Sequence, residues 1–295
     1  MQETLLVTAV VVLRVVSNPF ANVYQKQLTT RGNNPLIVNF LSYFILALFC
    51  SGLLFFIKDI SILNNDFWIY SILGGIVGAV GNGFLIKALQ MGDLSVLGPL
   101  NSYKSVVGII FGILLLAEIP NLWGIFGIGL IIYGSYFVLE TTDARFSWNL
   151  LRKKEIQFRL WAMILTAIEA IFIKKVIIAA SPTLAFVSWC SFGALFSFIV
   201  LFPNMADVGK ELKFTFRSQC LSKFLLLVLF IGVAQFSTTF VFDHMPVGYA
   251  LSLFQLSTIV SIFFGYKFFR EKEIRKKILG SVIMILGSIL IILMK

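Results

Sequence analysis

The sequence predicts an all-α integral membrane protein with ten transmembrane helices, formed by two inverted five-helix repeats. Of its 295 residues, 59% are hydrophobic and only 13% are charged, which is too little charge for the polar shell of a water-soluble domain. The chain divides into about ten apolar runs of roughly 20 residues, the length that a helix needs to cross the hydrocarbon core. A pattern in the first half also recurs in the second half.

The apolar runs predict the helix positions in order. The first run follows Met1, Gln2 and Glu3, which carry no basic charge, so we expect a membrane helix there and not a cleaved signal peptide. Pro35 and Pro182 each stand at the first turn of a predicted helix, where the missing backbone N–H costs nothing. The predicted spans are residues 4–25, 35–57, 67–90, 94–117, 121–140, 158–179, 182–202, 221–242, 246–269 and 274–294.

The internal repeat is visible in the spacing of glutamate and glycine. The matched pairs, each separated by 153 positions, are Glu118 and Glu271, Gly127 and Gly280, and Gly134 and Gly287. Because each copy holds an odd number of spans, the two copies are predicted to be inverted relative to each other in the membrane. The predicted repeats are residues 1–147 and 148–295.

The formal net charge of +10 comes from Lys and Arg in short joins beside the apolar runs, such as residues 152–154 and 275–277. Basic clusters at such positions typically fix topology and contact anionic lipid head groups, so nucleic acid is not an expected partner. By the positive-inside rule, the joins after the first, fifth, seventh and ninth spans lie in the cytoplasm. Both termini are then predicted to lie outside.

Several kinds of catalytic and metal chemistry are absent from the sequence. The single histidine, His244, excludes a zinc site of the HExxH type, and the three cysteines do not have metal-ligand spacing. There is no Walker A sequence for ATP hydrolysis. We therefore expect no cofactor, no metal and no enzyme activity, although a second catalytic group near Asp243 and His244 would indicate an enzyme.

Ionisable residues within the predicted spans mark a candidate substrate site. A charge at the bilayer centre costs at least ~2.5–3.5 kcal/mol on insertion scales, so it is expected to be paired or to face a polar cavity. Arg14, Lys104 and Glu169 lie near the middle of the first, fourth and sixth spans. The amide and hydroxyl residues that complete the predicted site are Asn18, Asn82, Asn101, Tyr103, Gln235 and Gln255.

Two interpretations of the three charged residues remain open. In one, Glu169 neutralises a cation and fixes the packing of the two halves. In the other, the excess positive charge binds an acidic substrate group, with Arg14 as a bidentate ligand and Lys104 as a point charge, while Glu169 holds an ammonium or exchanges a proton. Asn18 lies four residues after Arg14, and Pro19 frees backbone carbonyls one turn back, which is typical of a binding site.

Three further features of the sequence carry a family resemblance. The third and fourth helices are joined by Ala-Leu-Gln-Met-Gly-Asp at residues 88–93, Pro99 stands early in the fourth helix, and that helix ends in Leu-Leu-Ala-Glu at residues 115–118. In these features and in the glycine-rich fifth helix, the chain resembles the EamA-type, ten-helix members of the drug/metabolite transporter superfamily. The resemblance implies a carrier whose central cavity is lined mainly by helices 1, 3, 4, 6, 8 and 9. It also implies termini in the cytoplasm, against the charge distribution.

The predicted function is secondary transport across an inner cell membrane by alternating access. The predicted cargo is a small polar metabolite, with an amino acid or another acid-bearing or zwitterionic compound first, and protons are a candidate coupling ion. The alternative carrier moves a nucleotide-type or lipid-linked substrate, and the alternative of another class is a membrane scaffold or an intramembrane enzyme. The residues predicted to act in gating or structure are Pro19, Pro99, Glu118 and Glu271. The sequence leaves the direction of flux and the oligomeric state open.

Overall fold

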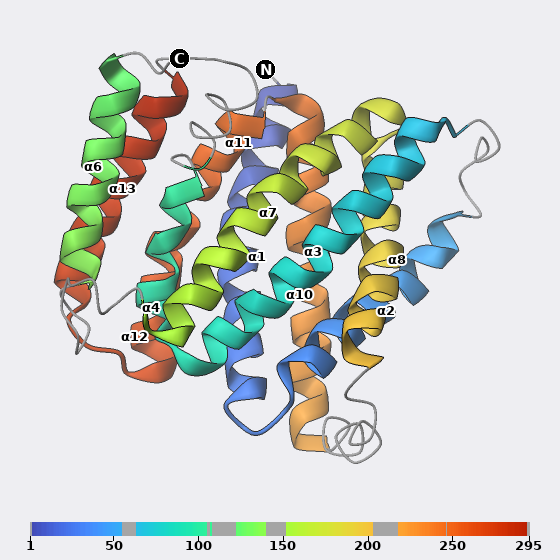
Figure 1. Ribbon diagram of the computed structural model, residues 1–295, viewed down its shortest axis with the longest axis horizontal. Helices are drawn as coiled ribbons and strands as arrows, with labels where there is room; N and C mark the ends of the chain where they lie inside the picture. The colour runs from blue at the N-terminus through green and yellow to red at the C-terminus, as the bar shows by residue number, and fades with distance from the viewer. Residues whose placement is uncertain are drawn as a thin grey trace.

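The computed structural model confirms an all-helical architecture (Figure 1). It describes residues 2–54, 63–104, 107, 122–139, 152–202, 218–245 and 247–293. The continuous helices in these residues are α1 (Gln2–Thr29), α2 (Pro35–Leu54), α3 (Asn65–Met91), α6 (Leu122–Leu139), α7 (Lys154–Ala179), α8 (Pro182–Leu201), α10 (Ser218–His244) and α13 (Ile274–Leu293). With the two broken helices below they make up the predicted ten. Of the described helices, α1, α2, α3, α8 and α10 are long and apolar enough to cross a membrane.

The predicted spans 94–117 and 246–269 are not single continuous helices. The first begins as the short helix α4 (Leu94–Leu97) and continues as the 3₁₀ helix η2 (Pro99–Ser102), where proline removes a backbone donor. The second is divided by a turn into α11 (Val247–Phe254) and α12 (Ser257–Phe269). At this turn the backbone hydrogen bonds run to the carbonyl three residues back, not four, which tightens the chain and ends the first helix.

The two breaks lie at equivalent positions of the repeats and contact each other. Ser102, at the end of η2, precedes Gln255 by the repeat distance of 153 positions. The Gln255 side chain donates from Nε2 to the backbone carbonyl of Asn101 over 3.1 Å. Backbone that leaves the helical pattern at membrane depth is tolerated where protein or a water-filled cavity surrounds it, and transporters place substrate sites at such breaks.

The packing of the helices follows an approximate two-fold relation between the halves. By order along the chain, α1, α2, α3 and α6 correspond to α7, α8, α10 and α13. The most extensive contacts join α1 to α10, α3 to α7, α2 to α8 and α6 to α13 (Figure 1). If each helix is replaced by its equivalent in the other half, the contact of α1 with α10 becomes the contact of α7 with α3. The contacts of α2 with α8 and of α6 with α13 stay the same. The arrangement therefore has the symmetry that two repeats of one fold require.

The contact between α6 and α13 depends on glycines of the sequence repeat. A Cβ atom built on Gly134 would lie 2.6 Å from the carbonyl oxygen of Gly280, and one built on Gly287 would lie 2.6 Å from that of Gly127. Only glycine lets two helix backbones approach so closely. Since the earlier glycine of α6 meets the later glycine of α13, these equivalent helices are antiparallel, as inverted repeats require.

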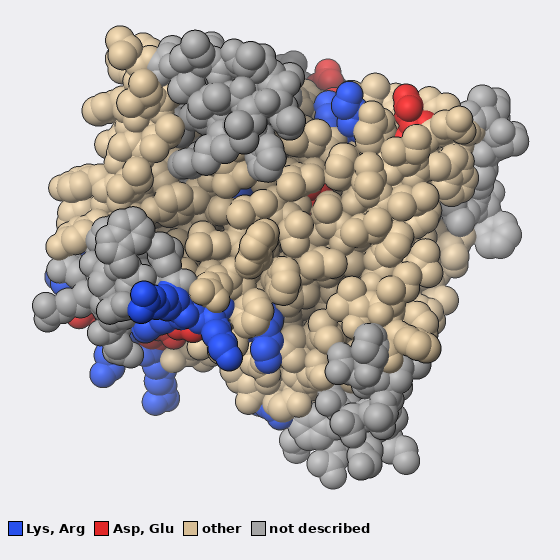
Figure 2. Space-filling view, viewed as in Figure 1, with Lys and Arg blue, Asp and Glu red and all other residues tan. Residues whose placement is uncertain are grey.

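Positive charge gathers at one end of the bundle. The exposed basic residues beside the turn between α12 and α13 are Lys267, Arg270, Lys272, Arg275 and Lys276. Figure 2 shows most of the visible Lys and Arg at the lower left and a smaller charged group at the upper edge, whereas the face between them is almost free of charge. Helix α1 begins and α13 ends at the opposite end in Figure 1. Uncharged sides and one basic end suit a protein that crosses a membrane.

The glycine contact between α6 and α13 predicts a stability difference between two alanine variants. Gly287→Ala places a Cβ against the Gly127 backbone, whereas Gly129→Ala, with no atom within 4 Å, meets open space. Both changes raise helix propensity equally, so the difference isolates packing, which we expect to cost Gly287→Ala about 1–3 kcal/mol. Thermal unfolding in detergent should show a lower midpoint for Gly287→Ala than for Gly129→Ala. Equal midpoints would contradict the close approach of the two helices.

Candidate functional site

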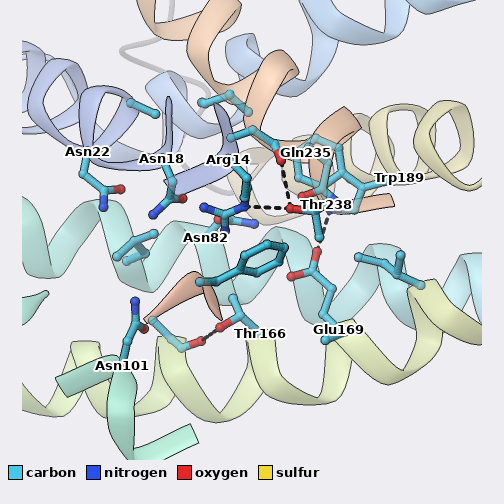
Figure 3. Close-up of a pocket in the computed structure, with 18 of the residues that line it drawn as sticks. Arg14, Asn18, Asn22, Asn82, Asn101, Thr166, Glu169, Trp189, Gln235 and Thr238 are labelled. Carbon is cyan, nitrogen blue, oxygen red and sulfur yellow. Dashed lines mark hydrogen bonds between the residues drawn. The ribbon is translucent and has the colours of Figure 1, made fainter. Parts of the chain in front are cut away.

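A cavity of about 140 Å³ lies at the centre of the bundle and is lined from both halves of the chain (Figure 3). Side chains of α1, α2, α3, η2, α7, α8, α10 and α11 contribute to its wall. For comparison, an engineered apolar cavity of about 150 Å³ in another protein holds one benzene molecule. The volume suits a small metabolite and is well below the roughly 300–1,000 Å³ of sites that hold drug-sized ligands.

Most of the polar residues selected from the sequence meet in this cavity. The predicted residues that line it are Arg14, Asn18, Asn82, Asn101, Lys104, Glu169 and Gln235. Tyr103 does not line it, because its hydroxyl donates to Ser135 Oγ on α6 over 2.7 Å. Gln255 is buried behind the cavity at the turn between α11 and α12, where it binds the Asn101 carbonyl.

Arg14 is held by the second half of the chain and keeps a free donor. Its Nε donates to Thr238 Oγ1 on α10 over 2.7 Å, and the guanidinium lies 4.8 Å from the centre of the Phe254 ring. Its Nη1 is buried and has no hydrogen-bond partner among the described residues. Figure 3 shows Arg14 beside Gln235 and Thr238. Because a buried unpaired donor costs about 1–3 kcal/mol or more, this atom is suited to a ligand.

Glu169 is buried without a cation in direct contact. Its Oε1 accepts a hydrogen bond of 2.6 Å from Trp189 Nε1, and its carboxylate fills the space beside Gly78, where any Cβ would collide with it. In the part of the chain that the structure describes, no ion pair within 4.0 Å joins it to Arg14 or Lys104. Glu169 therefore forms no direct ion pair of the kind expected if its role were to neutralise a cation and fix the packing of the two halves.

Amide side chains make up much of the remaining wall. Asn82 donates from Nδ2 to the Tyr43 hydroxyl over 2.6 Å and to the Gly78 carbonyl over 3.0 Å. Asn39 donates to the Ala79 carbonyl over 2.9 Å. These bonds fix two asparagines between α2 and α3, so the polar wall on that side is built before any ligand arrives.

Sequence analysis missed several residues that line the cavity. Arg159 is the most important, because it adds a third cation; it is 5% exposed and donates from Nε to the Leu97 carbonyl over 2.8 Å. The predicted span began at residue 158, whereas α7 begins at Lys154, so Arg159 lies more than a turn inside the helix. The sequence did hold a signal for Arg159, because its spacing to Thr166 and Glu169 places the three residues on one helix face.

The polar face of α1 extends beyond the two residues that were predicted. Asn22 and Gln25 follow Arg14 and Asn18 at intervals of four and three residues and line the same cavity. Helical spacing alone points to both of them. Gln25 is 4% exposed, and its Oε1 has no hydrogen-bond partner among the described residues. The other polar or aromatic lining residues absent from the prediction are Asn39, Ser42, Tyr43, Thr166, Trp189, Thr238, Phe242 and Phe254.

Glu271 joins the two halves at the basic end of the bundle. Its carboxylate accepts the backbone N–H groups of Leu94 and Ser95, each over 2.9 Å, and the Nζ of Lys26 over 3.1 Å. Lys26 also donates to the Gly92 carbonyl over 2.8 Å. A glutamate of the second half thus caps the first turn of α4 in the first half, where the helix dipole favours an anion.

The pair of Lys26 and Glu271 is almost completely buried, with side chains 9% and 3% exposed. Burial by itself raises the pKa of the Glu271 carboxyl, but the Lys26 ammonium and the hydrogen bonds from Ser95 and Lys26 outweigh it, so the pKa lies below its ordinary value. The sequence prediction ended the first helix at residue 25. The structure extends α1 to Thr29 and so brings Lys26 into this contact.

Pro19 and Pro99, two of the other residues predicted to act in gating or structure, lie within the described helices. Pro19 is buried inside α1 and does not end the helix. Pro99 opens η2 directly after α4. Glu118 lies outside the described residues.

Comparison with known proteins agrees with this architecture. The model of the EamA-like transporter family matches residues 7–140 and 153–293. Proteins of Streptococcus pyogenes serotypes M1, M3 and M6, named provisionally as sugar uptake proteins, are 26% identical over 250 residues, covering 78% of this chain and 80% of theirs. A protein crystal structure superposes with a TM-score of 0.64 at 12% identity, covering 97% of both chains, which supports the fold. Since the family model matches both halves, the chain belongs to the EamA-like transporter family.

Proposed function

We propose that the protein is a secondary transporter that moves a small acid-bearing solute across an inner cell membrane by alternating access. The observation that carries this proposal is the unpartnered Nη1 of Arg14 in a central polar cavity. The charged side chains that line the cavity among the described residues are Arg14, Lys104, Arg159 and Glu169. Three cations face one anion, so an acidic group on the cargo would reduce the charge imbalance.

The proposed movement rests on the two-fold relation of the halves. The cavity lies between helices of both repeats, and the contacts of α1 with α10 and of α3 with α7 are equivalent under exchange of the halves. In transporters built this way, one repeat rocks against the other around a fixed central site. The division at residues 147 and 148 is the boundary we propose for these two bodies.

Glu169 is our candidate for proton coupling. Its carboxyl group is buried in the cavity wall, and no described cation lies within 4.0 Å to hold it ionised. It therefore has the setting in which a carboxyl group can take up and release a proton as the cavity is exposed to each side. An amino acid cargo would instead place its ammonium against this carboxylate.

A neutral sugar is the second candidate cargo. The Streptococcus pyogenes relatives are named for sugar uptake, and the amide-rich wall offers both donors and acceptors to hydroxyl groups. A nucleotide-type cargo is disfavoured by the volume of about 140 Å³. A scaffold would need no polar cavity, and the family match favours a carrier over an enzyme.

Substitutions in the cavity should separate binding from coupling. In proteoliposomes with an imposed pH gradient, we expect Arg14→Ala to lower uptake of an acidic cargo roughly 10- to 100-fold, since a hydrogen bond to a charged group contributes about 1.5–3 kcal/mol. Glu169→Gln should abolish proton-driven uptake and keep cargo exchange. Lys267→Ala, which removes an exposed cation far from the cavity, is the control and should transport normally. Full activity of Arg14→Ala would refute the proposed site.

The buried contact of Lys26 with Glu271 is proposed to close the basic end of the bundle. We expect Glu271→Gln to lower the free energy of unfolding by about 3–5 kcal/mol, because the buried Lys26 charge then has only the exposed carboxylate of Asp93, at 3.9 Å, as an acidic partner. The control is Glu273→Gln in the same turn, whose partner Lys276 and own side chain are 52% and 51% exposed. It should cost less than about 1 kcal/mol. Thermal unfolding of both variants measures the difference.

The same pair should give the stability a defined pH dependence. Because the pKa of Glu271 is lowered in the folded protein, its contribution is complete above the unfolded pKa of about 4.3 and is lost as the pH falls through the folded value. The gap between native and Glu271→Gln unfolding midpoints should therefore shrink only in acid. A gap that does not change down to strongly acidic pH would contradict the buried ion pair.

Cysteine labelling should decide the orientation in the membrane. In a background with Cys50, Cys190 and Cys220 replaced by serine, we expect Lys276→Cys to react with a membrane-impermeant maleimide only after permeabilisation, because the positive-inside rule places this basic end in the cytoplasm. Thr4→Cys, exposed at the other end of the bundle, should react in intact cells. The reverse pattern would support the cytoplasmic termini implied by the family resemblance.

A further inference from the structure

The cavity wall contains a zone of unpaired amides next to Arg14. Asn18 and Asn22 of α1 and Asn101 of η2 line the cavity, and their side chains form no hydrogen bond with another described residue. An amide group offers both hydrogen-bond donors and an acceptor. It therefore matches a hydroxyl group, which also donates and accepts hydrogen bonds. Figure 3 shows these three asparagines on one side of Arg14. The zone is therefore suited to a compound with several hydroxyl groups.

The opposite side of Arg14 is suited to an anion. Gln235 Nε2 is a second buried donor without a described partner, alongside Arg14 Nη1. Gln235 lies three residues before Thr238 on the same face of α10, and Thr238 accepts a hydrogen bond from Arg14 Nε, so Gln235 lies beside the Arg14 side chain (Figure 3). Two neighbouring N–H donors fit the two oxygens of a carboxylate, and a charged donor makes the bond stronger.

The separation of the two zones sets the size of the ligand. Asn18 is one helical turn from Arg14, about 6 Å along α1, and Asn22 is about 12 Å away. A single sugar ring with a carboxylate can place the acid at Arg14 and its hydroxyls at Asn18 and Asn101. Together with the cavity volume of about 140 Å³, this distance favours one ring and not an oligosaccharide.

The charges of the wall disfavour a zwitterion. Glu169 is the acidic side chain among the described lining residues, and Trp189 already binds its Oε1. The other ionisable groups of the described wall, Lys104 and Arg159, are cations that repel an ammonium group. An amino acid therefore satisfies the anion zone, but its ammonium would meet one carboxylate, already bonded by Trp189, beside two cations.

We propose that the cargo is a monosaccharide acid, held by its carboxylate at Arg14 and Gln235 and by its hydroxyls at Asn18 and Asn101. This inference rests on the proposed transport function and narrows it to one substrate class.

Binding and exchange measurements on the purified full chain test the inference. The probes are D-glucuronate, D-glucose, which has the ring without the carboxylate, acetate, which has the carboxylate without the ring, and L-alanine, a zwitterion. Affinity is measured by calorimetry in detergent and exchange by counterflow in proteoliposomes. We expect D-glucuronate to bind at least about 10-fold more tightly than each of the other three, since each zone adds hydrogen bonds to charged or polar groups.

Two variants test which residues bind the carboxylate and which bind the hydroxyl groups. Arg14→Ala should reduce D-glucuronate affinity to that of D-glucose, and Asn18→Leu should weaken D-glucuronate about 10-fold and leave acetate unchanged. If the leucine variant does not fold, Asn18→Ser is used in its place and should lower the affinity for D-glucuronate by a smaller factor. Thr8→Val, an exposed position on α1 outside the cavity, is the control with unchanged binding.

The outcomes distinguish the inference from the function on which it rests. Exchange of L-alanine that depends on Arg14, without binding of D-glucuronate, overturns the sugar-acid class and leaves the carrier of acid-bearing solutes standing. Equal binding of D-glucose and D-glucuronate overturns the inference in favour of a neutral sugar. If no probe binds or exchanges in a folded protein, both the inference and the proposed function fail for these classes.

Discussion

The structure depends on how a positive charge is accommodated in the middle of a membrane-crossing bundle. Arg14 is half-buried, and its guanidinium is fixed by Thr238 and the Phe254 ring, which belong to the other half of the chain. A guanidinium cannot lose its proton at any relevant pH, so its charge has to be solvated by polar groups or by a ligand. The central cavity supplies that environment, and the same contact joins α1 to α10 across the two repeats.

The broken helices are the second consequence of this polar centre. A backbone that leaves the helical pattern would be costly against lipid, but η2 and the turn at Gln255 meet each other through the Asn101 carbonyl inside the protein. Both breaks occupy equivalent positions of the repeat. The duplication therefore explains why polar backbone from both halves reaches one place, and why the cavity wall includes η2 and α11 as well as long helices.

The basic end of the bundle is held by one buried carboxylate. At the basic end, Glu271 receives hydrogen bonds from Lys26, Leu94 and Ser95, so a single carboxylate joins α1, α4 and the turn before α13. The desolvation of such a pair is repaid only when both partners and the surrounding donors are in place. A contact of this kind is either formed or broken, which suits the closure of the basic end that we propose.

The sequence by itself determined the positions of the helices, the duplication and three of the four charged residues in the described cavity wall, Arg14, Lys104 and Glu169. Apolar runs and the spacing of glycine with glutamate are local patterns, and a charge such as Arg14 within an apolar run is conspicuous for the same reason. Tertiary structure alone decided that Tyr103 turns to Ser135, that Trp189 holds Glu169, and that Lys26 meets Glu271 across 245 residues. These contacts depend on which faces of distant helices pack together, and the order of residues along one helix does not specify that.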